Sequence, residues 1–169
     1  MTDADVLAEA GKLANPGPGL YQQTTEIVSA EVPGAAPEQA DRLRDQLSGI
    51  EKKSARLCVT EEQAAAGFQQ LLKEIADGLN GMECGFTAFE ASPPRMNATL
   101  ACTGAGEAKA GLKMAGTTSA DGYDVTMDLD ASGPHIAGGS MTMRMKVVSQ
   151  RTGDCPSPGS TELPPEVER

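Results

Sequence analysis

The chain has 169 residues, a formal net charge of -10, and an aromatic content of two Tyr, three Phe and no Trp. That length suits one domain with its own hydrophobic core and is short for two. The acidic charge would repel a phosphate backbone, and the apolar runs are too short to cross a bilayer, so we expect neither nucleic-acid binding nor a membrane span.

The N-terminal third is predicted to alternate between helix and strand. Residues 1–15 form a polar helical lead-in, because apolar residues recur at helical spacing before the sequence "NPGPG" ends the helix. Residues 20–32 are rich in Thr, Ile and Val, which is typical of a strand. In residues 37–50 the apolar positions are three and four apart, which predicts a helix with one narrow buried face, and Pro37 suits its first turn.

The clearest helical pattern follows a short predicted strand at residues 54–59. Thr60 and Gln63 are spaced as a capping box, in which each side chain bonds a backbone N–H of the other residue. Apolar residues then line one face of residues 68–79 at helical spacing. An apolar helix face is buried by packing against another element, so we expect this helix and the helix at residues 37–50 to pack on a sheet.

A hairpin is predicted where the chain turns at Pro93, because the flanking residues alternate between apolar and polar. In the register centred on that residue, the directly opposed pairs are Cys84 with Cys102, Phe86 with Leu100, and Ala88 with Ala98.

The four cysteines favour two disulfides over a metal site, because no two of them form a C-x-x-C pair and only one histidine is present. The hairpin register would place the Cα atoms of Cys84 and Cys102 about 4.5 to 5.5 Å apart, which a disulfide tolerates. By exclusion Cys58 joins Cys155. Two disulfides indicate an oxidising compartment, and we expect the chain to be a mature exported protein whose signal segment has been removed.

The C-terminal half alternates with the period of a strand. Residues 108–114, 125–130 and 141–148 each have an apolar and a polar face, with the turn signals "SADG" and "SGPHIAGG" between them. We therefore predict a single α+β domain over residues 16–156. It is a curved antiparallel sheet of about six or seven strands, covered on one face by two helices and holding two disulfides. Residues 157–169 are Pro-rich and are expected to form a disordered tail.

The methionines Met141, Met143 and Met145 alternate along the last predicted strand and allow two interpretations. Thioethers are ligands for Cu(I). Same-face positions on a strand, however, lie roughly 6.6 to 6.8 Å apart, too far for two sulfurs to reach one ion without distortion. Because aromatic residues are few and Met adapts to irregular gaps, we expect these side chains to fill the core.

The sequence "DLDASG", which contains Asp128 and Asp130, matches the opening of a calcium-binding loop. Position twelve of such a loop would be Gly139 instead of a bidentate Glu, and the flanking residues have strand character. We therefore expect outward carboxylates on a strand, with Asp124 able to complete a weak divalent-metal site. His135 lies in a Gly- and Pro-rich turn, where we expect it to be exposed and without a catalytic role.

Five stretches of the sequence together resemble one bacterial family. They are "PGLY" at 18–21, "LCVTEEQ" at 57–63, "MECGF" at 82–86, "LACTG" at 100–104 and "MTMRMKVVSQRTGDCP" at 141–156. Their order and the cysteines within them resemble the family catalogued as domain of unknown function 3617. The chain is particularly similar to alphaproteobacterial, sphingomonad-type members that look like exported proteins or lipoproteins, although Tyr21 stands where many members have Trp.

This resemblance implies a periplasmic or envelope location, oxidised cysteines and no known catalytic residues. It also implies membrane attachment through a lipidated cysteine that would have stood near the place of Met1. No constellation in the sequence specifies a reaction or a cofactor. We therefore expect a non-enzymatic protein that binds an envelope protein or a small apolar ligand between its helices and its sheet. The alternative hypothesis is a divalent-metal or copper-binding protein that uses the three aspartates or the three methionines named above.

Overall fold

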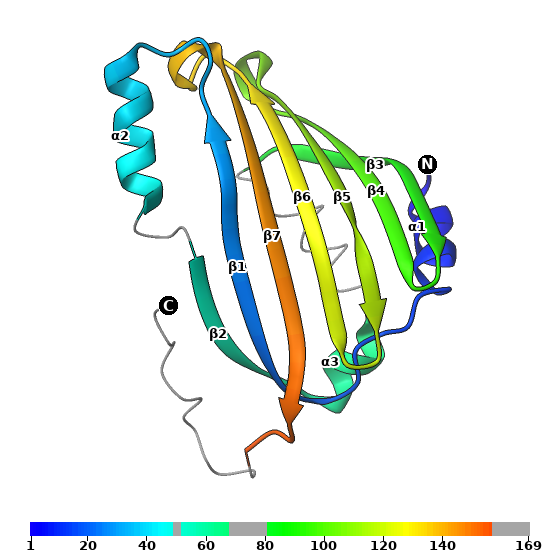
Figure 1. Cartoon of the computed structure of the whole chain (residues 1–169). Helices are drawn as coiled ribbons and strands as arrows, with labels where there is room; N and C mark the ends of the chain where they lie inside the picture. Colours follow the sequence, from blue (N-terminus) through cyan, green and yellow to red (C-terminus); the bar gives the residue numbers. More distant parts are fainter. Residues whose placement is uncertain (49–51, 68–80, 157–169) are drawn as a thin grey trace.

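A computed structural model gives the structure of the protein, of which residues 1–48, 52–67 and 81–156 are described. In this part of the chain seven strands form one antiparallel sheet in the order β2-β1-β7-β6-β5-β4-β3 (Figure 1). The strands are β1 (Gly19–Glu31), β2 (Lys52–Val59), β3 (Glu83–Ser92), β4 (Arg95–Thr103), β5 (Lys109–Ser119), β6 (Gly122–Ser132) and β7 (Ser140–Gly153). The predicted antiparallel sheet is therefore confirmed.

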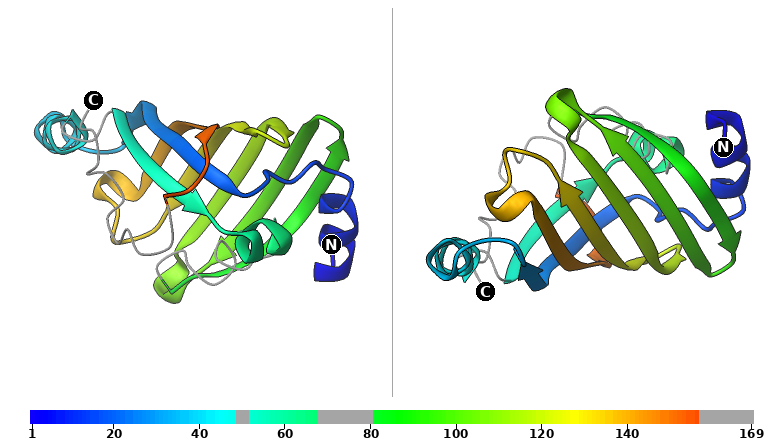
Figure 2. Two further views of the ribbon diagram at one scale, coloured as in Figure 1. Left: turned by 90° about the horizontal axis from the view of Figure 1, so that it is seen from below. Right: turned by 90° about the horizontal axis from the view of Figure 1, so that it is seen from above.

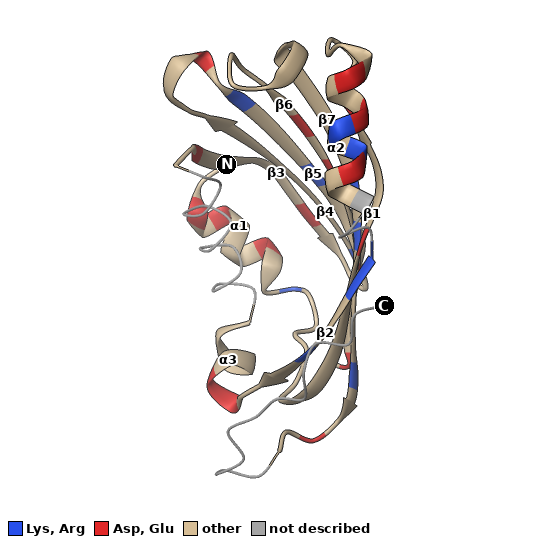
Figure 3. Cartoon of the chain, turned by 90° about the vertical axis from the view of Figure 1, so that its left-hand side faces the viewer, with Lys and Arg blue, Asp and Glu red and all other residues tan. Residues whose placement is uncertain are grey.

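Three α-helices accompany the sheet in the described residues: α1 (Asp3–Ala10), α2 (Pro37–Ser48) and α3 (Glu61–Ala66). α1 and α3 lie on the concave side of the sheet, whereas α2 stands beside β1 at the edge of the sheet (Figures 1 and 3). Two short 3-10 turns, at Ala105–Glu107 and Ala137–Gly139, connect neighbouring strands. The helix predicted over 68–79 and the predicted disordered tail at 157–169 lie outside the described residues.

Both disulfides form as predicted. Cys84 and Cys102 are directly opposed on β3 and β4, with their Cα atoms 4.1 Å apart. Cys58 on β2 joins Cys155, which follows β7, at a Cα separation of 5.4 Å. The second bridge therefore ties the end of the domain to the β2 edge of the sheet.

The β3–β4 hairpin departs from the predicted register beyond its first few pairs. Phe86 is opposite Leu100 as expected, but Ala88 is opposite Thr99 instead of Ala98. A β-bulge causes the shift, because one extra residue of β3 is accommodated between two consecutive pairs. As a result Phe89 turns inward and is 3% exposed, while Ala88 faces solvent.

The lead-in is a helix, as expected, and it also contributes to the hydrophobic core. Thr2 and Asp5 form a capping box that fixes the start of α1. Val6, Ala10 and Leu13, which are among the apolar residues at helical spacing, are all at least nine-tenths buried. The helix is shorter than the pattern predicted, because the turn at Gly11 ends it before the Pro-containing segment.

α2 begins at Pro37 as predicted, but its narrow apolar face is only partly buried. Ala40, Leu43 and Leu47 keep intermediate exposure. The helix contacts β1 near one edge of the sheet. Its polar remainder faces solvent, so α2 does not supply the main cover of the sheet.

Candidate functional site

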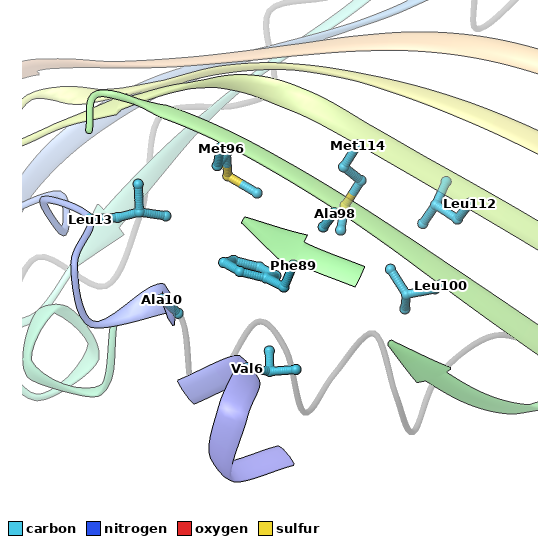
Figure 4. Close-up of a cluster of buried hydrophobic side chains, with 9 residues drawn as sticks. All are labelled: Val6, Ala10, Leu13, Phe89, Met96, Ala98, Leu100, Leu112 and Met114. Atoms are coloured by element: carbon cyan, nitrogen blue, oxygen red, sulfur yellow. The ribbon is translucent and has the colours of Figure 1, made fainter. Parts of the chain in front are cut away.

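A cluster of buried apolar side chains lies between α1 and the β3–β4–β5 part of the sheet (Figure 4). Phe89 stands at its centre, with Val6 and Ala10 of α1 on one side and Met96 and Ala98 of β4 on the other. The edge-to-face contact of the Phe86 and Phe89 rings, with centroids 5.8 Å apart, extends it along β3. We call the side of the sheet that carries this cluster the inner face.

The inner face continues beyond the cluster as an apolar surface on β6, β7 and β1. Directly opposed residues of antiparallel strands share a face, so the register shows which side chains continue it. Leu129 is opposite Met143, and Met127 is opposite Met145. Ile27 of β1 is opposite Met145 in turn. We call the partly exposed residues of this surface the Met-rich patch: Ile27, Val125, Met127, Leu129, Met141, Met143 and Met145. Val147, which is opposite Val125 on the same face, is 9% exposed and belongs to the core.

Every side chain of the Met-rich patch is partly exposed, in contrast to the cluster under α1. Three of its members on β6 pack directly against that cluster, so the two surfaces are continuous. Among the described helices, the main contacts with the sheet are those of α1 with β3 and of α2 with β1, and the centre of the patch lies on neither strand. The expectation that Met141, Met143 and Met145 fill the core is therefore not met: they have apolar neighbours across the strands, but all three stay partly exposed and lie outside the buried cluster.

A row of polar side chains bounds the patch at the end where β5 turns into β6. Thr118, Tyr123, Ser149 and Gln23 are successive opposed residues on β5, β6, β7 and β1. The Tyr123 hydroxyl donates to Gln23 Oε1 at 3.1 Å. Burial raises the pKa of Tyr123, and a hydrogen bond with Ser149 partly opposes that increase. The phenol is therefore a neutral hydrogen-bonding group at ordinary pH.

Thr118 completes this row with an unsatisfied hydroxyl. The residue is 3% exposed, and its Oγ1 has no hydrogen-bond partner in the structure. A buried hydroxyl without a partner costs about 1 to 3 kcal/mol. The polar end of the inner face therefore has unused hydrogen-bonding capacity.

Two hollows lie near opposite ends of strands β5, β6 and β7. The first, of about 230 Å³, is bordered by Lys109, Asp130, Ser132 and Thr142, among others. The second, of about 370 Å³, is bordered mainly by polar residues of the β5–β6 turn and of β7. Ligand pockets usually have volumes of about 300 to 1,000 Å³, so the first hollow is smaller than is usual and the second lies at the lower end of that range.

The three candidate metal-ligating aspartates lie on β6, and two of them pair with basic residues of β7. Asp128 accepts two hydrogen bonds from the guanidinium of Arg144, at 2.6 and 3.1 Å, which lower the pKa of this carboxyl. Asp124 lies 3.7 Å from the Lys146 ammonium. Figure 3 shows acidic and basic positions next to one another along these strands.

Within the described ranges, no three His, Cys, Asp or Glu side chains are close enough to hold a metal ion. Asp130 is exposed and borders the smaller hollow instead of joining the other two aspartates. The alternation of the strand explains the separation, because it spreads these carboxylates along one face instead of wrapping them around one point. The structure therefore does not bring the aspartates together into a site.

The remaining candidate groups have structural surroundings. His135 is exposed in the connection between β6 and β7. All four cysteines are in disulfides. Tyr21 is 1% exposed, and its hydroxyl donates to the Gly17 carbonyl oxygen at 2.7 Å. Burial raises the pKa of Tyr21.

The described elements define a class of protein. It has a curved, open antiparallel sheet with two disulfides, helices on the concave side of the sheet and an apolar inner face. The chain belongs to the family described as "Protein of unknown function (DUF3617)", whose model matches residues 16–155. Neither a curated protein nor a solved structure matches the chain significantly. No described helix is long and apolar enough to cross a membrane.

Proposed function

We propose that this protein is a non-enzymatic component of the bacterial cell envelope that binds a small apolar ligand on the inner face of its sheet. The observation that carries the proposal is the Met-rich patch, whose side chains stay partly exposed although they continue a buried core. Apolar surface left accessible in this way gains free energy when a guest removes it from water, at about 25 cal/mol per Å².

The side chains of the patch suit an adaptable binding surface. Met127, Met143 and Met145 have flexible, polarisable side chains that can repack around guests of different shape. Aromatic rings would make a more rigid surface, and the patch contains none. These properties favour a flexible apolar ligand over a rigid planar one.

The chemistry of the described residues supports binding more than catalysis. The thiols are used in disulfides, and the one histidine is exposed in a loop. The tyrosine pKa values are raised, so neither phenol is prepared to act as a base near neutral pH. The disulfides also support an oxidising compartment, for which we propose the periplasm, with attachment to the envelope through an N-terminal lipid.

Native mass spectrometry of protein purified from the periplasm of a bacterial host tests the proposal directly. We expect a non-covalent adduct in the mass range of a lipid, which an organic solvent removes. The stripped protein should then bind cis-parinaric acid, a fluorescent fatty acid, with saturation. A ligand-free protein that also fails to bind this probe would contradict the proposal and leave a protein partner as the other explanation of the exposed apolar surface.

A matched pair of variants locates the binding surface. Met127→Gln keeps the length of a side chain in the patch but makes it polar, whereas Thr126→Gln changes the adjacent residue on the opposite face. We expect the first variant to weaken probe binding by about tenfold, equivalent to about 1.4 kcal/mol, and the second to have no effect. Equal affinities for the two variants would place the ligand elsewhere.

A further inference from the structure

α1 covers part of the inner face but lies outside the family domain. The family model matches residues 16–155, whereas α1 ends at Ala10. The family model therefore matches the residues that form the apolar surface of β3 and β4, and the match does not extend to the helix that covers this surface here.

Within the described residues, α1 is held mainly by its contacts with β3. Val6 and Ala10 are its buried apolar side chains and both are small, while Leu13 is buried in the segment that follows the helix. Glu9 Oε2 accepts a hydrogen bond from the Ala91 backbone N–H at 3.3 Å, and the same carboxylate pairs with Lys12 on its own segment. Leu7 is 39% exposed, so this position of the helix is not part of its buried face.

The chain beyond α1 is fixed to the sheet independently of the helix. The Gly17 N–H donates to the Ala120 carbonyl oxygen at 2.9 Å, and the Gly17 carbonyl accepts from the Tyr21 hydroxyl. The first bond holds the segment before β1 against the β5–β6 turn, and the second fixes this segment to β1 itself. α1 can therefore leave the sheet through a change in residues 11–16 alone, without disturbing any strand pairing.

We propose that α1 is a displaceable lid over the inner face, and that it moves aside to admit the apolar ligand. This inference rests on the proposed function and concerns its regulation. The surface that α1 covers, around Phe89 and Leu100, is continuous with the Met-rich patch through Leu129 and its neighbours on β6. A ligand on the patch can therefore extend under α1 only when the helix is displaced. When no ligand is bound, α1 keeps the apolar cluster away from water.

Hydrogen exchange of the full chain, read by mass spectrometry, tests whether α1 opens by itself. We expect the α1 amides to exchange at least about tenfold faster than those of β4 and β5, through a local opening that leaves the sheet folded. Val6→Asp should accelerate exchange in α1 and leave β4 and β5 unchanged. Leu7→Asp is the matched control, because it adds the same charge one residue away at an exposed position. A loss of protection in β4 and β5 together with α1 would show that the helix is a fixed part of the core, and would overturn the lid.

Binding of cis-parinaric acid to the same proteins tests whether the opening controls the site. Val6→Asp should bind the probe about tenfold more tightly than the wild type, because it no longer closes the lid, whereas Leu7→Asp should match the wild type. If the wild type binds and Val6→Asp binds no more tightly, the lid is refuted while the proposed function stands. If no variant binds, the proposed function itself fails, even where hydrogen exchange shows that α1 opens.

Discussion

Leu100→Ala should be among the most destabilising single substitutions in the described part of the domain. Leu100 is 1% exposed on β4, between Phe86 on β3 and Leu112 on β5, and both of these neighbours are held in place by strand pairing. Truncation of a buried Leu to Ala costs about 2 to 5 kcal/mol, and the cost is larger where neighbours cannot close the cavity. We therefore expect a loss of about 3 to 4 kcal/mol in the free energy of unfolding.

Urea denaturation followed by circular dichroism, with the disulfides intact, measures this loss. A change of that size lowers the melting temperature by roughly 6 to 16 °C in a domain of this length, at about 2 to 4 °C per kcal/mol. Leu57→Ala is the matched control, because Leu57 lies on the edge strand β2 and is 40% exposed, and we expect it to cost less than about 1 kcal/mol. Equal losses for the two variants would refute the assignment of the core.

Three further predictions concern the disulfide to the sheet edge, a buried phenol and an exposed ion pair. Replacing both Cys58 and Cys155 with Ala releases a bridge that spans 97 residues, and chain entropy values it at up to about 4.7 kcal/mol; an unchanged urea midpoint would contradict this. Tyr21→Phe leaves the Gly17 carbonyl without its buried donor, so we expect a loss of about 1 to 2 kcal/mol, measurable by thermal unfolding; an unchanged stability would contradict this and show that another donor replaces the hydroxyl. The guanidinium opposite Asp128 lowers the pKa of that carboxyl, so its stabilising effect is present above the ordinary carboxyl pKa and is lost as pH falls through the lowered value. The difference in stability between wild type and an Asp128→Asn variant should therefore disappear in acid, and a difference that grows in acid would have the wrong sign.

The candidate site was only partly visible in the sequence. Alternation along residues 141–148 correctly indicated a strand with methionines on one face. Which strands lie beside it depends on the register, and the register brings Met145 between Met127 and Ile27, residues far apart along the chain. The exposed fraction of the patch, on which the proposed function rests, depends on where the helices pack, and periodicity has no information about that.

The sequence by itself determined local features: the strand and helix periods, the capping box at Thr60, and the pairing of Cys84 with Cys102 across a short hairpin. The capping box at Thr2 is equally local, although the pattern did not identify it. These features depend on residues close together in the chain, where spacing alone decides the geometry. Only the tertiary structure decided that Phe89 turns inward, because a bulge changes which residues face the core without changing the composition of the strand. It also decided that α1 covers the inner face, since Glu9 and Ala91 meet across 82 residues of chain. Burial of apolar surface selects such distant contacts, and it depends on the assembled shape more than on any one segment.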